Sequence, residues 1–258
     1  MDTLADMAEP ETIATAARTL GCHSVAFTYN DPVIFLEYAV DVAIACREQN
    51  IRTVAVTAGE ICPEPRTEFF SYMDAVNVDL KAFTERFYRQ ICGGDLNTVL
   101  DTLVYLKRET GVWFEITNLL IPGENDEEDE LNELSTWVAD QLGPDVPLHF
   151  TTFHPDWKLL KHKVTPPKTL TRARDIALGN GLRYVYTGNV HDKEGGATLC
   201  HVCGKKLVAR DWYVLGDWEL SDDGRCLSCG TPCAGRFDGP PGEWGARRLP
   251  VHLRDFAI

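Results

Sequence analysis

The chain has 258 residues, of which 44% are hydrophobic and 25% charged, an ordinary composition for a globular protein with one large and one small domain. Its formal net charge of −14 argues against a nucleic-acid backbone or an anionic membrane as the main partner. No apolar run is long enough to span a bilayer and nothing marks export, so we expect a cytoplasmic protein whose nine cysteines are thiols or metal ligands.

Helical and strand-like patterns alternate along the chain as far as about residue 192. A helix candidate at 10–20 comes before the first strand. The apolar runs predict strands that begin at residues 24, 53, 75, 112, 146 and 182. The helical patterns between them lie at 32–49, 64–72, 84–108 (with a break at Gly93-Gly94), 127–141 and 168–180. This alternation predicts an α/β fold with right-handed crossovers and a parallel sheet, either open or closed into a barrel.

The composition changes near residue 192. Two glycines are followed by four cysteines in two pairs, and the sequence from Phe237 onward is rich in Gly, Pro and Arg without periodicity. We therefore predict three parts: an α/β domain over 1–192, a cysteine-containing module over 193–236 and a flexible extension over 237–258.

Polar residues gather where the predicted strands end, which is where parallel α/β sheets bind ligands. An acid, an amide and a base on one face suit a zwitterionic or hydroxyl-rich ligand. Asn30-Asp31-Pro32 is equally typical of a helix cap, and Asp79 with Lys81 of a surface ion pair. The candidate ligand-binding residues are Thr28, Tyr29, Asn30, Asp31, Thr57, Gly59, Asn77, Asp79, Lys81 and Thr152.

Five segments carry a family resemblance. They are "GCHSVAFTYNDPVIFLEY", "VNVDLKAFTERFYRQICGG", "LLIPGENDEEDEL", "FHPDWK" and "LRYVYTGNV". Together they resemble the radical S-adenosylmethionine enzyme of the AmmeMemoRadiSam system, which is similar to the activating enzymes of glycyl-radical proteins. The resemblance implies a partial (β/α)6 barrel that holds a [4Fe-4S] cluster and S-adenosylmethionine. It also implies reductive cleavage of that molecule to a 5′-deoxyadenosyl radical, an electron donor, and a protein substrate or partner proteins of the same system.

The resemblance also implies roles for the candidate residues. In "TYNDP", Asn30 and Asp31 would contact the methionine amino group. In "DLK", Asp79 and Lys81 would contact the carboxylate or ribose region, with Asn77 beside them. The remaining matches are Thr57 and Gly59 in "VTAGE", where Ala58 departs from the family pattern, and the strand around Thr152, whose backbone would lie near the adenine.

The three-cysteine motif of this family, Cys-x3-Cys-x2-Cys, does not occur in the 258 residues. Three thiolates would hold three irons of the cluster and leave the fourth open. We therefore expect the chain to lack the first βα unit of the barrel and to be cluster-deficient, with the enzyme being its full-length form. One alternative is a non-catalytic interaction or ligand-binding remnant; another is a zinc protein that binds a nucleotide-like ligand without iron.

The two cysteine pairs predict a metal site. Cys200-x2-Cys203 and Cys226-x2-Cys229 are separated by 22 residues, and each pair is followed by glycine. Two such turns typically close a tetrahedral four-thiolate zinc site, which is structural rather than catalytic. A site for iron, or an iron–sulfur centre that uses Cys233, is the alternative. We therefore predict a zinc-ribbon-like module.

Overall fold

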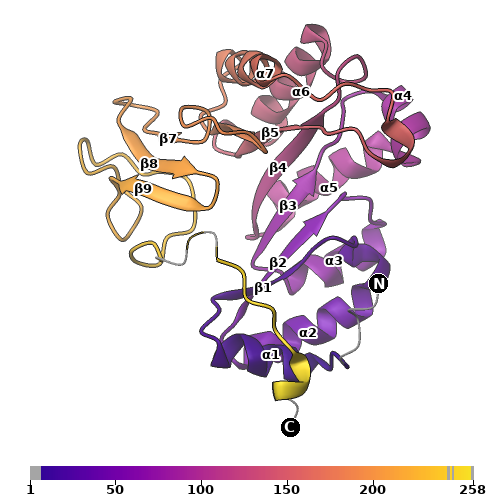
Figure 1. Ribbon diagram of the computed structural model, residues 1–258, viewed down its shortest axis with the longest axis vertical. Coiled ribbons are helices and arrows are strands. Elements are labelled where there is room, and N and C mark those ends of the chain that lie inside the picture. Colours follow the sequence, from indigo (N-terminus) through magenta and orange to yellow (C-terminus); the bar gives the residue numbers. More distant parts are fainter. Residues whose placement is uncertain (1–6, 243–244, 246, 257–258) are drawn as a thin grey trace. The chain divides into compact units, whose positions relative to one another are not determined.

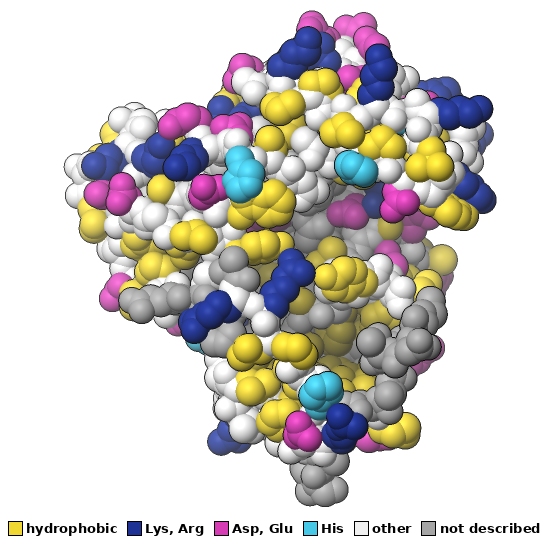
Figure 2. Space-filling view, in the orientation of Figure 1, with side chains coloured by type: hydrophobic (Ala, Val, Ile, Leu, Met, Phe, Trp, Pro, Cys, Tyr) yellow, Lys and Arg dark blue, Asp and Glu magenta, His cyan; other side chains and the backbone are white. Residues whose placement is uncertain are grey.

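The computed structural model describes residues 7–242, 245 and 247–256. The chain divides into two compact units: Met1–Val78, Asp101–Phe114 and Arg248–Ile258 form the first, and Asp79–Leu100 with Glu115–Arg247 form the second. On the face seen in Figure 2, acidic and basic side chains are intermixed in several separate groups. None of the helices in the described ranges has both the length and the apolar character that crossing a membrane requires.

The first unit alternates helices with short parallel strands. Its elements are α1 (Pro10–Thr19), β1 (Ser24–Phe27), the 3-10 turn η1 (Pro32–Phe35), α2 (Leu36–Glu48), β2 (Arg52–Thr57), α3 (Pro63–Ser71) and β3 (Ala75–Asp79). Proline opens α1, η1 and α3, where its missing N–H costs no hydrogen bond. Thr53 fixes the entry to β2, because its N–H donates to Asp74 Oδ2 (2.8 Å) and its hydroxyl to the Tyr72 carbonyl (2.6 Å).

The second unit continues the alternation. Its elements are α4 (Glu85–Phe87), the π-helical turn η2 (Tyr88–Cys92), the start of α5 (Leu96–Glu109), β4 (Trp113–Leu120, from Glu115), α6 (Glu128–Gln141), β5 (Leu148–Thr152), η3 (Trp157–Leu159), α7 (Pro167–Gly179) and β6 (Val185–Gly188). Buried and half-buried residues alternate strictly along β4, with Ile116 and Leu120 fully buried. This period of two is the pattern of a strand with two different faces.

The six strands follow the chain order in one sheet, β1-β2-β3-β4-β5-β6 (Figure 1). The pairs β1–β2 and β2–β3 are parallel, and so are β4–β5 and β5–β6. The predicted α/β class with a parallel sheet is confirmed. The helical stretch predicted over 84–108 begins as expected, with Thr84 as the cap of α4, although residues 88–92 form a π-helical turn rather than α-helix. The predicted break is confirmed: Gly93 has a positive φ of 76°, which favours glycine.

A three-stranded antiparallel sheet follows β6 in the second unit. It consists of β7 (Thr198–Leu199), β8 (Lys206–Asp211) and β9 (Val214–Trp218), in that order. The cysteine pairs flank this sheet, one between β7 and β8 and one after β9. Near the chain's C-terminal end, η4 (Leu253–Phe256) contacts α1 within the first unit. The boundaries proposed at 192 and 236 stay predictions.

Candidate functional site

Asp31 joins the ends of β1 and β2. Its Oδ1 accepts hydrogen bonds from Val33 N (3.1 Å) and Thr57 Oγ1 (2.9 Å), and its Oδ2 accepts one from Ala58 N (2.7 Å). The Thr57 hydroxyl in turn accepts from Gly59 N (3.0 Å). The helix-cap interpretation of Asp31 is therefore confirmed, and the same carboxylate also fixes the loop after β2. A carboxylate has about four acceptor positions, so it retains capacity for a ligand donor.

The residues just before Asp31 face solvent. Tyr29 is 97% exposed and has a positive φ of 71°, a backbone conformation that is uncommon for a bulky residue. Asn30 is exposed, and its N–H donates to the Thr28 carbonyl (3.1 Å) in the same tight turn. The predicted residues Thr28 to Asp31 thus form a polar turn at the carboxyl end of β1. Strained backbone of this kind is concentrated at binding sites.

Two further predicted residues of the first unit lie on or after neighbouring strands. Gly59 is buried with a φ of 76°, directly after β2. Asn77 is half-buried on β3, where it is the register partner of Val56. We call the set Thr28–Asp31, Thr57 and Gly59 the β1–β2 rim.

In the second unit, Asp79 and Lys81 form an ion pair. The Lys81 Nζ lies 2.8 Å from Asp79 Oδ2, and both side chains are about one-third exposed. The Lys81 backbone is held at both ends: its N–H donates to the Tyr88 hydroxyl (3.1 Å) and its carbonyl accepts from Asn125 Nδ2 (2.7 Å). The predicted ion pair between Asp79 and Lys81 is therefore present at the surface. Separately, the Thr152 hydroxyl donates to the Asn189 carbonyl (3.0 Å).

Two buried amides that the sequence did not single out organise the loops after β3 and β4. Asn118 donates to the Leu80 carbonyl (2.7 Å), and its buried Oδ1 has no hydrogen-bond partner among the described residues. Asn125 accepts from Ile121 N (2.7 Å) while it donates to the carbonyls of Lys81 and Leu119. Because each amide acts across the fold, neither role has a local sequence signal.

The four predicted metal ligands come together in the second unit. The sulfur atoms of Cys200, Cys203, Cys226 and Cys229 all lie within 4.8 Å of one another. Cys200 Sγ is 3.6 Å from Cys229 Sγ, and Cys203 Sγ is 3.7 Å from Cys226 Sγ. Tetrahedral zinc with bonds of about 2.3 Å needs sulfurs about 3.8 Å apart, whereas a disulfide needs about 2 Å. The site therefore fits one tetrahedral metal ion.

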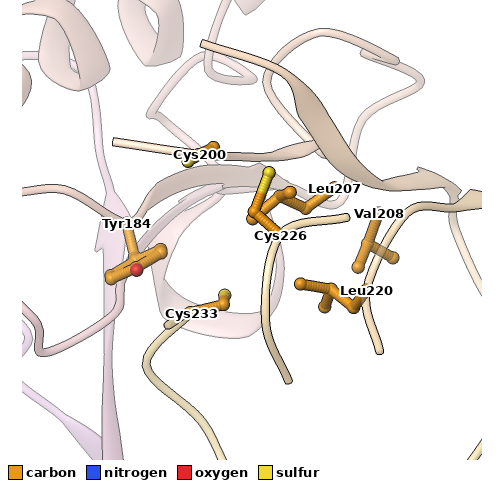
Figure 3. Packing of buried hydrophobic residues seen from close by; sticks show 7 residues of the cluster. All are labelled: Tyr184, Cys200, Leu207, Val208, Leu220, Cys226 and Cys233. Carbon is orange, nitrogen blue, oxygen red and sulfur yellow. The ribbon is translucent and has the colours of Figure 1, made fainter. Parts of the chain in front are cut away.

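The surroundings of this four-cysteine site suit a structural metal. Cys200 and Cys226 are buried in an apolar cluster with Leu207, Val208 and Leu220, while Cys233 lies apart beside Tyr184 (Figure 3). Hydrogen bonds with the hydroxyl and the backbone of Thr231 lower the pKa of Cys229 to about 6, which favours its thiolate form. A metal ion bound by all four thiolates would have no open coordination position, which is typical of structural rather than catalytic centres.

The remaining cysteines lie on separate elements. Cys46 is buried within α2, and burial raises its pKa to about 11, as for an inert core thiol. Cys22, Cys62 and Cys92 are exposed, before β1, at the start of α3 and in η2. Within the described ranges, the four-cysteine site is the only group of three or more side chains arranged to hold a metal ion. The described cysteines therefore do not supply a Cys-x3-Cys-x2-Cys set for a [4Fe-4S] cluster.

Comparison with known proteins covers most of the chain. The profile of the Radical SAM superfamily matches residues 3–134. An uncharacterized protein of Methanocaldococcus jannaschii is 38% identical over 224 residues, which is 86% of this chain and 66% of the relative. The GTP 3′,8-cyclase of Limosilactobacillus fermentum is 25% identical over 219 residues, 76% of this chain and 64% of the relative. The chain thus spans about two thirds of these relatives, at 66% and 64%.

Solved structures share the fold. A domain of pyruvate-formate lyase-activating enzyme from Bacteroides vulgatus matches with a TM-score of 0.57 at 18% identity, over 64% of this chain and 99% of that one. Streptococcus suis SuiB bound to S-adenosylmethionine gives 0.56 at 16% identity, over 71% and 42% of the two chains. A radical SAM methyltransferase from Sphaerobacter thermophilus gives 0.53 at 15% identity, over 67% and 53%.

Proposed function

The chain belongs to the radical S-adenosylmethionine (radical SAM) superfamily, and we propose that it binds S-adenosylmethionine at the β1–β2 rim. The observation that carries the proposal is Asp31, which is held by three hydrogen bonds from η1 and the end of β2 and sits beside the exposed Asn30. A fixed carboxylate and an amide oxygen are suitable acceptors for the ammonium group of methionine. Their preorganisation lowers the entropic cost of binding.

The other predicted contacts belong to the same proposal. Lys81 would donate to the methionine carboxylate and Asp79 would accept from the ribose hydroxyls, with Asn77 beside them. These assignments follow the "DLK" match and the charges of the side chains. Thr152 would mark the strand whose backbone lies near the adenine.

The chemistry proposed for this chain is binding and orientation of S-adenosylmethionine. A [4Fe-4S] cluster with three thiolate ligands, where one is bound, would supply the electron for reductive cleavage of S-adenosylmethionine to methionine and a 5′-deoxyadenosyl radical. We propose this cleavage reaction only for a form of the protein that binds such a cluster and has an electron donor. We also propose that the protein belongs to the AmmeMemoRadiSam system and acts on a protein substrate or with partner proteins of that system. This proposal rests on the motifs quoted in the sequence analysis.

The test is the affinity for S-adenosylmethionine, measured by isothermal titration calorimetry. Asn30→Ala should weaken binding about tenfold, because a hydrogen bond to a charged group contributes about 1.5 kcal/mol or more. Asn97→Ala, an exposed asparagine of α5 whose side chain bonds Glu85, is the matched control and should leave the affinity unchanged. Equal affinities of the wild type and Asn30→Ala would contradict the assigned site.

A second candidate function is that of a binding protein without radical chemistry. The observation in its favour is that the described cysteines bring four thiols together at one place but no Cys-x3-Cys-x2-Cys set. Anaerobic iron–sulfur reconstitution separates the two candidates. About four irons per chain, with a visible charge-transfer band, would support cluster chemistry in this chain. Zinc alone, with S-adenosylmethionine binding retained, would support the second candidate.

A further inference from the structure

A pocket of about 340 Å³ lies within the second unit, between the sheet and the hairpin of β8 and β9. Its inner wall comes from β4, β5 and β6, and its outer wall from the end of β8 and the turn that follows. The loop between β6 and β7 closes one side. This volume is within the range of small-molecule sites. None of the β1–β2 rim residues lines it.

The inner wall carries three interacting side chains. His149 Nε2 lies 2.6 Å from Glu115 Oε2, and its ring stacks on Tyr186 with centroids 4.9 Å apart and an interplanar angle of 25°. His149 and Tyr186 are register partners on β5 and β6, which explains the stacking. The Tyr186 hydroxyl lies 3.0 Å from Thr198 Oγ1. This wall is therefore flat, aromatic and rigid.

The outer wall supplies a guanidinium group from β8. Arg210 Nη1 donates to Thr198 Oγ1 (2.7 Å) and to the Gly196 carbonyl (3.3 Å), and its Cζ lies 5.6 Å from the centroid of the Tyr186 ring. These contacts fix the plane of the group through one nitrogen. Of the five N–H donors of arginine, those on Nη2 and Nε have no protein acceptor in the described part of the chain, and no carboxylate there lies within 4.0 Å.

Each of the three acids that line the same pocket has a hydrogen-bond partner within the protein. Asp211 Oδ1 is 2.9 Å from His191 Nδ1, and Glu115 is paired with His149. Asp192 accepts from the Thr187 hydroxyl (2.9 Å) and from Gly195 N (2.9 Å), and the latter bond is the largest cause of its lowered pKa. The Cβ of any other residue at 195 would collide with both of those side chains, so this turn has little freedom. Among the described residues that line the pocket, Arg210 is the only lysine or arginine, and it donates to the Thr198 hydroxyl and the Gly196 carbonyl.

We propose that this pocket binds a small organic carboxylate with a planar, unsaturated body. The carboxylate would take the two free edges of Arg210, a bidentate geometry that the guanidinium group favours. The planar body would lie along the Tyr186 wall under the rim formed by Trp212 and Tyr213, which are 50% and 58% exposed. The three lining acids disfavour a phosphate dianion more than a singly charged carboxylate. That this ligand is the substrate rests on the proposed function; its binding does not.

The test uses indole-3-acetate as the probe and its neutral isostere indole-3-acetamide as the comparison. Protein labelled with 5-fluorotryptophan is titrated and followed by ¹⁹F NMR, with the Trp212 resonance assigned from Trp212→Phe. Indole-3-acetate should shift that resonance in a saturable manner and bind at least tenfold more tightly than the amide. Arg210→Gln should remove this preference. Arg89→Gln, an exposed arginine of η2 that pairs with Glu85, is the matched control and should keep it.

Four results would overturn the proposal, and three of them concern selectivity: equal binding of the acetate and the amide, tighter binding of the cation tryptamine, or an unchanged preference in Arg210→Gln. Displacement of the probe by equimolar inorganic phosphate would also overturn it, because the site would then be selective for charge alone. The affinity for S-adenosylmethionine should be the same in Arg210→Gln and wild type. A failed probe experiment therefore leaves the β1–β2 rim proposal standing, and the reverse also holds.

Discussion

Replacement of one metal ligand should dismantle the four-cysteine module, and Cys226→Ser is the sharpest case. Cys226 Sγ lies 3.7 Å from Cys203 Sγ, so its loss opens the tetrahedron. Structural zinc contributes on the order of 10 kcal/mol to folding of small modules. The buried aliphatic side chains of the apolar cluster are Leu207, Val208 and Leu220, and burial contributes about 2 kcal/mol for each. The partly buried residues that pack against the cluster are Tyr186, Trp218, Ala234 and Phe237. The metal is therefore a stabilising contribution of the same order as the whole apolar cluster.

The assay is zinc content by mass spectrometry together with limited proteolysis of anaerobically purified protein. Wild type should hold about one zinc per chain and resist cleavage over 200–233, and Cys226→Ser should lose both properties. Cys233→Ser is the matched control, because Cys233 is buried in the same cluster but lies outside the ligand group. Retention of zinc by Cys226→Ser, or equal loss of zinc in both variants, would refute the reasoning.

Three further predictions follow from individual contacts. Asp31→Asn should lower the free energy of unfolding by about 1–3 kcal/mol in urea titrations, because its NH₂ group would face Ala58 N–H, whereas Asn30→Ala should change it by less than about 0.5 kcal/mol. Burial raises the pKa of Glu130 above its usual value of 4.5. The charge of Glu130 therefore destabilises the folded protein, and this penalty is absent at lower pH and develops as the pH rises through the raised pKa. Glu130→Gln should keep or raise Tm at pH 7.5, whereas Glu130→Ala should lower Tm because Phe83 N–H would lose its acceptor. Zinc chelation should weaken indole-3-acetate binding as strongly as Arg210→Gln, without changing the affinity for S-adenosylmethionine, because β8 begins three residues after Cys203.

The sequence predicted the features that local patterns encode. The alternating residues of 113–120 are typical of a strand with two faces, and this stretch forms β4. The two Cys-x2-Cys-Gly turns predicted the ligand group, because each turn places two thiolates on one ion. The helix predicted at 84–108 also begins where expected, at the Thr84 cap, but its local pattern did not predict that residues 88–92 form a π-helical turn.

The features that sequence reasoning missed depend on register between distant strands. Glu115 and His149 are 34 residues apart and come within 2.6 Å because β4 and β5 pair in one particular register. A shift of one residue would place His149 on the opposite face of the sheet. Arg210 does not belong to the six-stranded sheet. It lies on β8 of the antiparallel hairpin, which brings its guanidinium group to the Tyr186 ring. No local period reports such contacts, so the pocket becomes visible only in three dimensions.

The four-cysteine site and the pocket both depend on the β8–β9 hairpin of the second unit. Each Cys-x2-Cys pair adjoins the three-stranded sheet, so a metal bound by both pairs fixes the two ends of the β8–β9 hairpin. The hairpin in turn presents Arg210 to the Tyr186 face of β6. A metal ion bound by the four thiolates would therefore help to determine where the Arg210 guanidinium lies. The chain has a net charge of −14, so its surface as a whole favours cations over anions. A positioned arginine inside the pocket is the feature that would reverse this preference locally and favour a carboxylate ligand.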